Sequence, residues 1–322
     1  MRLSKGEGKT LVRNVIELGI NFIDTANAYG DSEEKIGEAI QEIPRESLVI
    51  ATKSMARDKK SFLEHLHTSL KRLKTDYIDI FQMHSVSSDD TMNKVMGPGG
   101  ALEGLEQAIT QGKVRHPAFS SHNLTVSKKL MLTGKFHAFQ VPFNFIDDEA
   151  AEEIIPLSRE LDLGMIAMKP LGGGLLDEAS LCFRYLMQFD GIVPDPGIEH
   201  VEEMKEIIDI VQNLSPLRED EKARMEQIKR KMGGSWCHRC EYCQPCPQGI
   251  PISLVLVSES IAKRMPYDSA ASFLKEAMQK AKNCTECREC VERCPYDLNI
   301  PELLEKRISS WKNYLQTKTW IL

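Results

Sequence analysis

The stretch "INFIDTANAYGDSEEKIGEAIQEI", residues 20–43, holds a short apolar run and then a longer amphipathic pattern. Residues 20–24 read as a β-strand, and residues 32–43 place apolar side chains at three- and four-residue spacing, which predicts a helix. The same unit recurs to about residue 213, with a second clear helical pattern at 61–73. The other candidate strands are residues 48–53, 77–84, 114–119, 137–142, 164–169 and 191–194.

This alternation of strands and helices predicts a parallel sheet, either doubly wound or closed into a barrel. The doubly wound dinucleotide fold carries G-x-G-x-x-G after its first strand, and the sequence has no such fingerprint. We therefore predict an α/β fold of the (β/α)8 barrel type. Only seven strands can be assigned. We expect the missing first strand to precede residue 1, and the alternative is a barrel with a gap beside its first helix. Ser32 and Ser61 are the expected N-caps of the two helices, and Glu64 would complete a capping box with Ser61.

Four residues with useful chemistry fall where predicted strands end or just after: Asp24, Tyr29, Lys53 and His84. Taken singly, each has a structural explanation: a turn cap, a core tyrosine, a solvated lysine and a hydrogen-bonded histidine. Active sites of (β/α)8 barrels lie at this rim. The occurrence of all four there indicates one catalytic site.

The chemistry of these four residue types fits carbonyl reduction. A tyrosine hydroxyl ordinarily has a pKa near ~10, which is too high for an efficient proton donor at neutral pH. A lysine ammonium beside it would stabilise the phenolate, and an aspartate would hold the lysine in place and keep it charged. A neutral histidine could donate a hydrogen bond to the carbonyl oxygen and orient it.

The segments "NFIDTANAYGDSEEKIGEAI" (21–40), "VIATK" (49–53) and "DYIDIFQMH" (76–84) resemble the signatures of the aldo-keto reductases. The resemblance covers most of residues 9–213 and includes the family's Asp–Tyr–Lys–His tetrad. It implies a nicotinamide-dependent carbonyl reductase, with NAD(P)H as hydride source and Tyr29 as proton donor. Asp24, Lys53 and His84 would take the remaining tetrad roles.

Further segments resemble the parts of the family that hold the nicotinamide ring. "RHPAFSSHN" (115–123) and "FQVPFNF" (139–145) implicate Ser120 and Gln140 in holding the carboxamide. Many family members have Ser-Asn where this chain has two serines. Met168 stands where a tyrosine commonly stacks on the nicotinamide.

The segment "PDPGIEHVEEMKE" (194–206), which contains Gly197, corresponds to the loop and helix that grip the adenosine end of the cofactor. It lacks the basic residues that clamp a 2′-phosphate in the family, and its glutamates would repel one. The missing first strand also removes a family segment that lines this pocket. The resemblance therefore leaves the choice between NADH and NADPH open.

Composition sets the class of protein. The chain has 322 residues, 42% of them hydrophobic and 27% charged, which leaves room for a large core. Its formal net charge of −6 argues against nucleic acid or an anionic membrane as a partner. The N-terminus lacks the apolar stretch of a secretory signal, and no run of 18 apolar residues occurs, so we expect a cytoplasmic protein. Thiols stay reduced there, which makes disulfides a poor explanation of nine cysteines.

Eight of the nine cysteines lie in two runs near the C-terminus: Cys237, Cys240, Cys243 and Cys246, and then Cys284, Cys287, Cys290 and Cys294. The second run has the C-x2-C-x2-C-x3-C-P spacing of bacterial ferredoxins, in which three thiolates hold one cluster and the fourth ligates the other. The first run is one residue shorter in its last step. The ninth cysteine, Cys182, is expected to be a small buried apolar residue.

Zinc is the alternative, since four thiolates can hold it tetrahedrally. Zinc sites usually pair two separated Cys-x2-Cys knuckles, whereas here each run carries four cysteines, so two 4Fe–4S clusters are favoured. The ferredoxin pattern assigns Cys237, Cys240, Cys243 and Cys294 to one cluster, and Cys284, Cys287, Cys290 and Cys246 to the other.

These motifs divide the chain into a barrel (1–213), a charged linker helix (214–235) and a small α-helical ferredoxin-like domain (236–322). The arrangement is similar to a subgroup of aldo-keto reductases that carries a C-terminal ferredoxin-like domain.

Three functions remain open. The clusters could exchange electrons with the nicotinamide chemistry, or they could be structural. Alternatively, the barrel could be inactive and serve as a redox-sensing or electron-transfer subunit. The expected partners are a small carbonyl or alcohol substrate and, as a further option, a redox protein; neither the substrate nor the oligomeric state can be read from the sequence.

Overall fold

The computed structural model describes residues 3–320. They form two compact units, which we treat separately. The first contains residues 3–170 and 182–215, and the second contains residues 171–181 and the chain from Pro216 onward. Residues 171–181, which we had assigned to the barrel, are thus grouped with the second unit.

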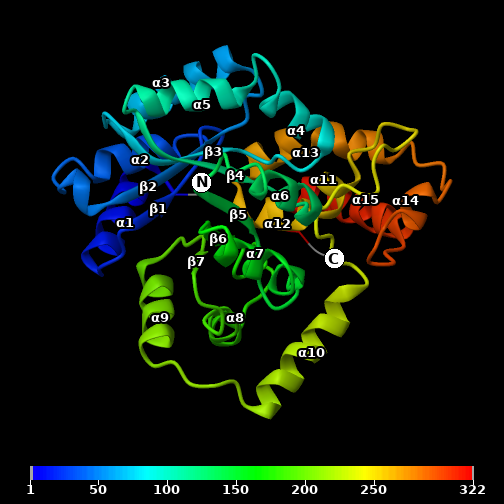
Figure 1. The fold of residues 1–322 in the computed structure, drawn as a ribbon. Helices are drawn as coiled ribbons and strands as arrows, with labels where there is room; N and C mark the ends of the chain where they lie inside the picture. The colour runs from blue at the N-terminus through cyan, green and yellow to red at the C-terminus, as the bar shows by residue number, and fades with distance from the viewer. Residues whose placement is uncertain (1–2, 321–322) are drawn as a thin grey trace. The chain divides into compact units, whose positions relative to one another are not determined.

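The first unit is built on seven parallel strands that pair in the order of the sequence (Figure 1). Within residues 3–320, β1 and β7 are the two edges of this sheet, and the expected additional strand before residue 1 lies outside the described residues. The predicted barrel-type fold and its seven strands are confirmed. The strands are β1 (Phe22–Asp24), β2 (Val49–Ser54), β3 (Ile78–Met83), β4 (Val114–Ser120), β5 (Ala138–Pro142), β6 (Gly164–Met168) and β7 (Ile192–Asp195).

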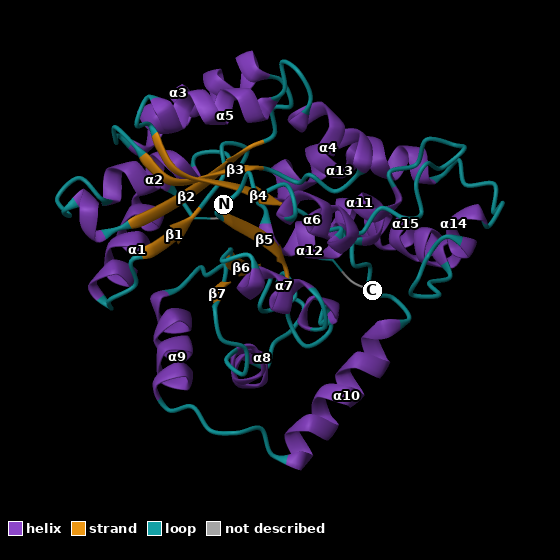
Figure 2. Ribbon diagram, in the orientation of Figure 1, coloured by secondary structure: helices purple, strands orange, loops and turns teal. Residues whose placement is uncertain are grey.

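Helices alternate with the strands along the chain (Figure 2), and neighbouring helices pack against one another. The helix pairs α1 and α2, α2 and α3, α3 and α5, and α1 and α9 are in contact, so the helices beside the two edge strands touch each other. The elements are α1 (Lys5–Glu17), α2 (Ser32–Ala39), α3 (Lys59–Leu73), α4 (Asp89–Met96), α5 (Ala101–Thr110), α6 (Leu124–Met131), α7 (Ile154–Glu160) and α9 (Val201–Gln212), with the 3-10 turns η1 (Arg45–Ser47) and η2 (Glu149–Ala151).

Local sequence explains how these elements pack. β2 is buried along almost its whole length, as expected for a parallel strand covered on both faces. Gly37 lets α2 approach the end of α3, because a Cβ at this position would lie 2.1 Å from the carbonyl oxygen of Arg72. Any larger residue at Gly37 would push the two helices apart.

The predicted N-caps were wrong. α2 begins after Asp31, and α3 begins after Asp58, whose side chain accepts a hydrogen bond from the backbone N–H of Ser61. Ser32 instead accepts a hydrogen bond from the hydroxyl of Thr25 at 2.9 Å. Aspartate and serine are both favourable N-cap residues. The sequence alone therefore could not show which of two such residues, a few positions apart, caps each helix.

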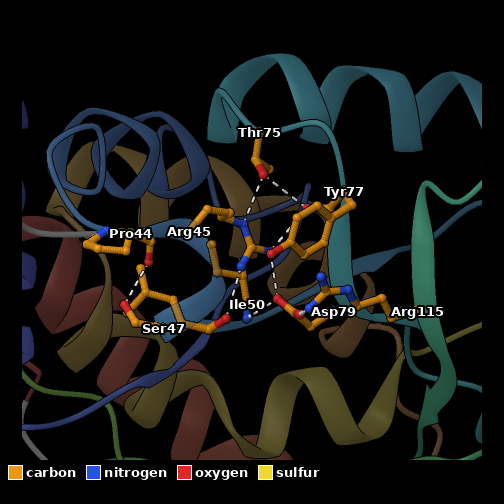
Figure 3. Close-up of polar contacts among 9 residues, drawn as sticks. Pro44, Arg45, Ser47, Ile50, Thr75, Tyr77, Asp79 and Arg115 are labelled. Atoms are coloured by element: carbon orange, nitrogen blue, oxygen red, sulfur yellow. Dashed lines mark hydrogen bonds and ion pairs between the residues drawn. The ribbon is translucent and has the colours of Figure 1, made fainter.

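A polar cluster around the buried Asp79 joins the amino ends of neighbouring strands (Figure 3), which is the end of the sheet opposite the predicted tetrad. Asp79 of β3 accepts hydrogen bonds from Arg45 at 2.6 Å and from Arg115 at 2.9 Å. It also accepts the backbone N–H of Ile50 at 2.9 Å. The guanidinium carbons of Arg45 and Arg115 lie 4.1 and 3.8 Å from the ring centroid of Tyr77. These contacts stabilise the fold at the end of a barrel that does not carry the chemistry.

The second unit is helical in the part of the chain that the structure describes. Its core combines apolar residues of α11, α13 and α15 with cysteine side chains of both runs. None of the helices within residues 3–320 combines the length and apolarity needed to cross a bilayer. The elements are α10 (Glu219–Gly233), α11 (Ile252–Leu256), α12 (Ser258–Arg264), α13 (Tyr267–Ala281), α14 (Glu289–Glu292) and α15 (Ile300–Thr317), and α8 (Ala179–Leu186) spans the division between the units.

Candidate active site and cysteine cavities

Lys53 and Asp24 form a buried ion pair at the carboxyl ends of β2 and β1. Their side chains are 2% and 5% exposed, and the Lys53 ammonium also donates to the carbonyl oxygen of Thr25 at 2.8 Å. Burial alone would lower the pKa of Lys53, but the charges of Asp24, Tyr29 and Asp195 outweigh it, so this pKa lies above its ordinary value. The lysine therefore stays charged at neutral pH.

Tyr29 and His84 lie beside this ion pair. The ammonium of Lys53 is 5.3 Å from the ring centroid of Tyr29. The Tyr29 and His84 rings meet edge-on, with centroids 5.8 Å apart. Both side chains are half-buried, and the backbone N–H of His84 donates to Ser54 of β2 at 2.9 Å. The four residues predicted for the tetrad thus occupy one place at the rim of the sheet.

Asp195, the last residue of β7, is a member of this group that the sequence did not suggest. Its carboxyl accepts a hydrogen bond from Gln140 Nε2 at 2.8 Å. Burial and the neighbouring charge of Asp24 raise the pKa of Asp195 to about 8, against the opposing effect of Lys53. We had ended the seventh strand at residue 194; one residue more would have placed Asp195 at the rim with the others.

Ser120 and Gln140 present a donor and an acceptor side by side. They are paired in register on β4 and β5, and both are 2% exposed. Ser120 Oγ accepts the backbone N–H of Ser85 at 2.9 Å, which leaves its hydroxyl proton free to donate. Gln140 Oε1 is buried and has no hydrogen-bond partner among the described residues. A carboxamide, which carries one acceptor and one donor group, fits this pair.

The two other residues expected at the cofactor lie at the ends of neighbouring strands. Met168 is half-buried and ends β6, directly opposite Asp195 in register. Gly197 is exposed in the loop between β7 and α9, with open space where a Cβ would be. At the start of α9, the carboxylate of Glu203 accepts the backbone N–H groups of Glu199 at 2.6 Å and His200 at 2.9 Å.

Within the second unit, the eight cysteines surround two separate cavities. Both cavities combine three cysteines of one run with the last cysteine of the other. Cys246, Cys284, Cys287 and Cys290 line one cavity. Cys237, Cys240, Cys243 and Cys294 line the other.

The two runs share an unusual backbone conformation. The residues on either side of the second cysteine are left-handed in both: Arg239 and Glu241 have φ of 61° and 66°, and Glu286 and Arg288 have φ of 54° and 63°. Left-handed residues other than glycine are uncommon, and their recurrence at matching positions indicates a shared requirement. Alternating hand turns successive N–H groups toward one side, a geometry found at many iron–sulfur sites.

The cavities disfavour free thiolates. Burial raises the pKa of Cys237 to about 12, and it also raises the pKa of Cys240, Cys243 and Cys290, with neighbouring cysteines adding to the effect in each case. A bound metal centre would supply the positive charge that four converging thiolates need. Among residues 3–320, no three His, Cys, Asp or Glu side chains converge tightly enough to hold a single metal ion. The remaining cysteine, Cys182, is fully buried, as predicted.

Comparison with known proteins identifies both parts. The family model described as "Aldo/keto reductase family" matches residues 2–181, more than half of the chain. The chain belongs to the aldo/keto reductase family. A "4Fe-4S dicluster domain" model matches residues 236–299, so this member carries an iron–sulfur domain after the reductase region.

Curated relatives match the reductase region of this family member. The "Uncharacterized oxidoreductase YqkF" of Bacillus subtilis (strain 168) is 31% identical over 191 residues, which cover 55% of this chain and 60% of the relative. The "Probable aldo-keto reductase 1" of Glycine max is 27% identical over 185 residues, which cover 53% of this chain and 52% of the relative. The chain therefore spans between about half and 60% of the length of these curated relatives.

Solved structures of the family share the fold. The holo form of aldo-keto reductase AKR11C1 from Bacillus halodurans superposes with a TM-score of 0.59 at 22% identity, covering 70% of this chain and 88% of that one. An aldo-keto reductase from Klebsiella pneumoniae, solved in complex with NADPH, gives a TM-score of 0.60 at 20% identity, covering 70% and 85%.

Proposed function

We propose that this protein is a nicotinamide-dependent oxidoreductase that reduces a carbonyl, or oxidises the corresponding alcohol, with Tyr29 as proton donor. The observation that carries the proposal is the charged, buried Lys53, held by Asp24 and lying 5.3 Å from the ring of Tyr29. An ammonium at this place would stabilise the negative charge that develops on the tyrosine oxygen as its proton leaves. Curated relatives described as oxidoreductases support the same chemistry.

The nicotinamide, when bound, supplies the hydride. Ser120 would donate to the carbonyl oxygen of the carboxamide, and Gln140 Oε1 would accept from its amino group. Tyr29 would deliver the proton to the substrate oxygen, which His84 orients from beside it. Lys53 would hold the negative charge that develops on the tyrosine oxygen, and Asp24 keeps Lys53 in place.

We propose that the protein prefers NADH to NADPH as its cofactor. Glu203 occupies the backbone N–H groups at the start of α9 with its own carboxylate. In the family this segment grips the adenosine end, and a 2′-phosphate there would meet a negative charge where it needs donors. The Klebsiella pneumoniae relative was solved in complex with NADPH, and that finding applies to the relative. For this chain, a preference for NADH is our proposal.

We further propose that the two cysteine cavities hold one 4Fe–4S cluster each, with the ligand sets named above. Two observations support clusters over zinc. The ligand sets cross between the runs, as in two-cluster ferredoxins, and the alternating left-handed residues turn N–H groups toward one side. A zinc site would also require sulfurs converging to about 2.3 Å from one ion. The clusters would let the protein exchange single electrons with a redox protein.

The test of this function is a comparison of wild type with Tyr29→Phe, both purified without oxygen. An aromatic aldehyde such as benzaldehyde serves as the substrate, and oxidation of NADH and of NADPH is followed by absorbance. We expect wild type to consume the nucleotide and Tyr29→Phe to lose about 100-fold or more in kcat, because the ring remains and only the proton donor is lost. Equal rates in both proteins would reject Tyr29 as the donor, and no rate in wild type would favour a redox-sensing barrel.

A further inference from the structure

Asp195 is the one carboxyl at the rim that the proposed chemistry leaves without a role. It ends β7, and its side chain reaches two residues on other strands, Gln140 on β5 and Asp24 on β1. The inference rests on the proposed nicotinamide site.

Two charged groups act on Asp195. Burial and the charge of Asp24 raise its pKa, and the charge of Lys53 lowers it.

The second contact of Asp195 decides which way the amide of Gln140 points. Its carboxyl accepts from Gln140 Nε2 at 2.8 Å, so the other amide atom, Oε1, remains as the acceptor. Without that contact, the amide could turn over and offer two donors to a carboxamide amino group, which it could not bind.

We propose that Asp195 is a positioning residue of the nicotinamide site, which fixes the amide of Gln140 as an acceptor. The charged groups that act on Asp195 are Asp24 of β1 and Lys53 of β2, with the neutral Gln140 on its other side.

Two variants of Asp195 test its positioning role. Asp195→Asn keeps an oxygen that can accept from Gln140 but cannot titrate, and Asp195→Leu has no acceptor at all. Asp190→Asn, an exposed position just before β7, is the matched control.

The measurement is the dissociation constant of NAD+ and of NADH, determined by calorimetry on the anaerobic holoprotein. We expect Asp195→Leu to bind both nucleotides about 10-fold more weakly than wild type, because Gln140 is no longer fixed. Asp195→Asn, which keeps an acceptor for Gln140, and Asp190→Asn should bind both nucleotides as wild type does. Unchanged binding by Asp195→Leu, or an equal loss in Asp195→Asn, would overturn the positioning role. A wild type that binds no nucleotide would instead overturn the proposed function.

Discussion

Lys53 is a long cationic side chain that is only 2% exposed, and its environment accounts for the cost of burying it. Asp24 supplies the opposite charge and Thr25 a carbonyl acceptor, so two of its three donors have partners on β1 or just after it. The sequence predicted this pair because both residues end strands that are neighbours in a parallel sheet. It could not predict Asp195, because the contact with Asp24 joins the first and last strands of the chain and depends on how the edges of the sheet approach each other.

Lys53→Met keeps most of the side-chain volume and removes the charge. Carbonyl reduction should fall by at least about 100-fold in kcat, because the phenolate of Tyr29 loses its stabilising cation. Nucleotide affinity should change far less, since Ser120 and Gln140 are untouched. Steady-state kinetics and calorimetry check both, with Lys59→Met, an exposed lysine on α3, as the control. A variant that keeps its kcat would remove Lys53 from the mechanism.

Among the elements, β3 carries a residue of the proposed site, His84, just after its end and a stabilising residue, Asp79, near its start. The periodicity of the sequence was sufficient to find the strands and helices, because parallel strands and amphipathic helices have different spacings of apolar residues. It was insufficient for the helix starts at Asp31 and Asp58, which depend on which of several polar neighbours reaches a backbone N–H.

The Asp79 cluster gives a stability prediction. Asp79→Ala should lower the free energy of unfolding by about 3 kcal/mol, because it leaves the largely buried Arg45 and the N–H of Ile50 without their acceptor. Arg115→Ala, which removes a half-exposed partner of the same carboxylate, should cost less than about 1 kcal/mol. Denaturant unfolding of both variants checks this, and similar losses in the two would contradict it.

The start of α9 gives a prediction on cofactor choice. Glu203→Gln keeps an oxygen for the N–H groups of residues 199 and 200 but removes the negative charge. The ratio of the NADPH to the NADH dissociation constant should fall by about 3-fold to 10-fold. Glu206→Gln, later on the same helix, is the control and should leave the ratio unchanged. Calorimetry with both nucleotides measures this ratio. An unchanged ratio in Glu203→Gln would show that the start of α9 does not contact the adenosine end of the cofactor.

On the scale of the whole molecule, the chain joins a reductase fold to an iron–sulfur domain. The spacing of the cysteines predicted ligand sets that cross between the two runs, and the same sets line the two cavities. The left-handed residues between the cysteines could not be predicted, because arginine and glutamate adopt that conformation only when the surrounding structure imposes it. Nor could the grouping of residues 171–181 with the second unit, which depends on packing rather than on periodicity.

Metal content follows from the proposed ligand sets. Protein purified without oxygen should contain about eight iron and eight acid-labile sulfide per chain. Cys287→Ser should lower both, whereas Cys182→Ser, at the one cysteine outside the runs, should leave them unchanged. Elemental analysis checks this, and zinc without sulfide in wild type would contradict the cluster assignment.

We propose that a hydride passes directly from a nicotinamide to a carbonyl carbon at the rim formed by Asp24, Tyr29, Lys53 and His84. The decisive test uses reduced nucleotide carrying deuterium on both faces of C4, an aromatic aldehyde, and mass analysis of the alcohol formed by the anaerobic holoprotein. We expect one deuterium on the alcohol carbon in every product molecule. Alcohol without deuterium would show that the electrons reached the substrate by another route, such as the clusters, and would disprove direct hydride transfer.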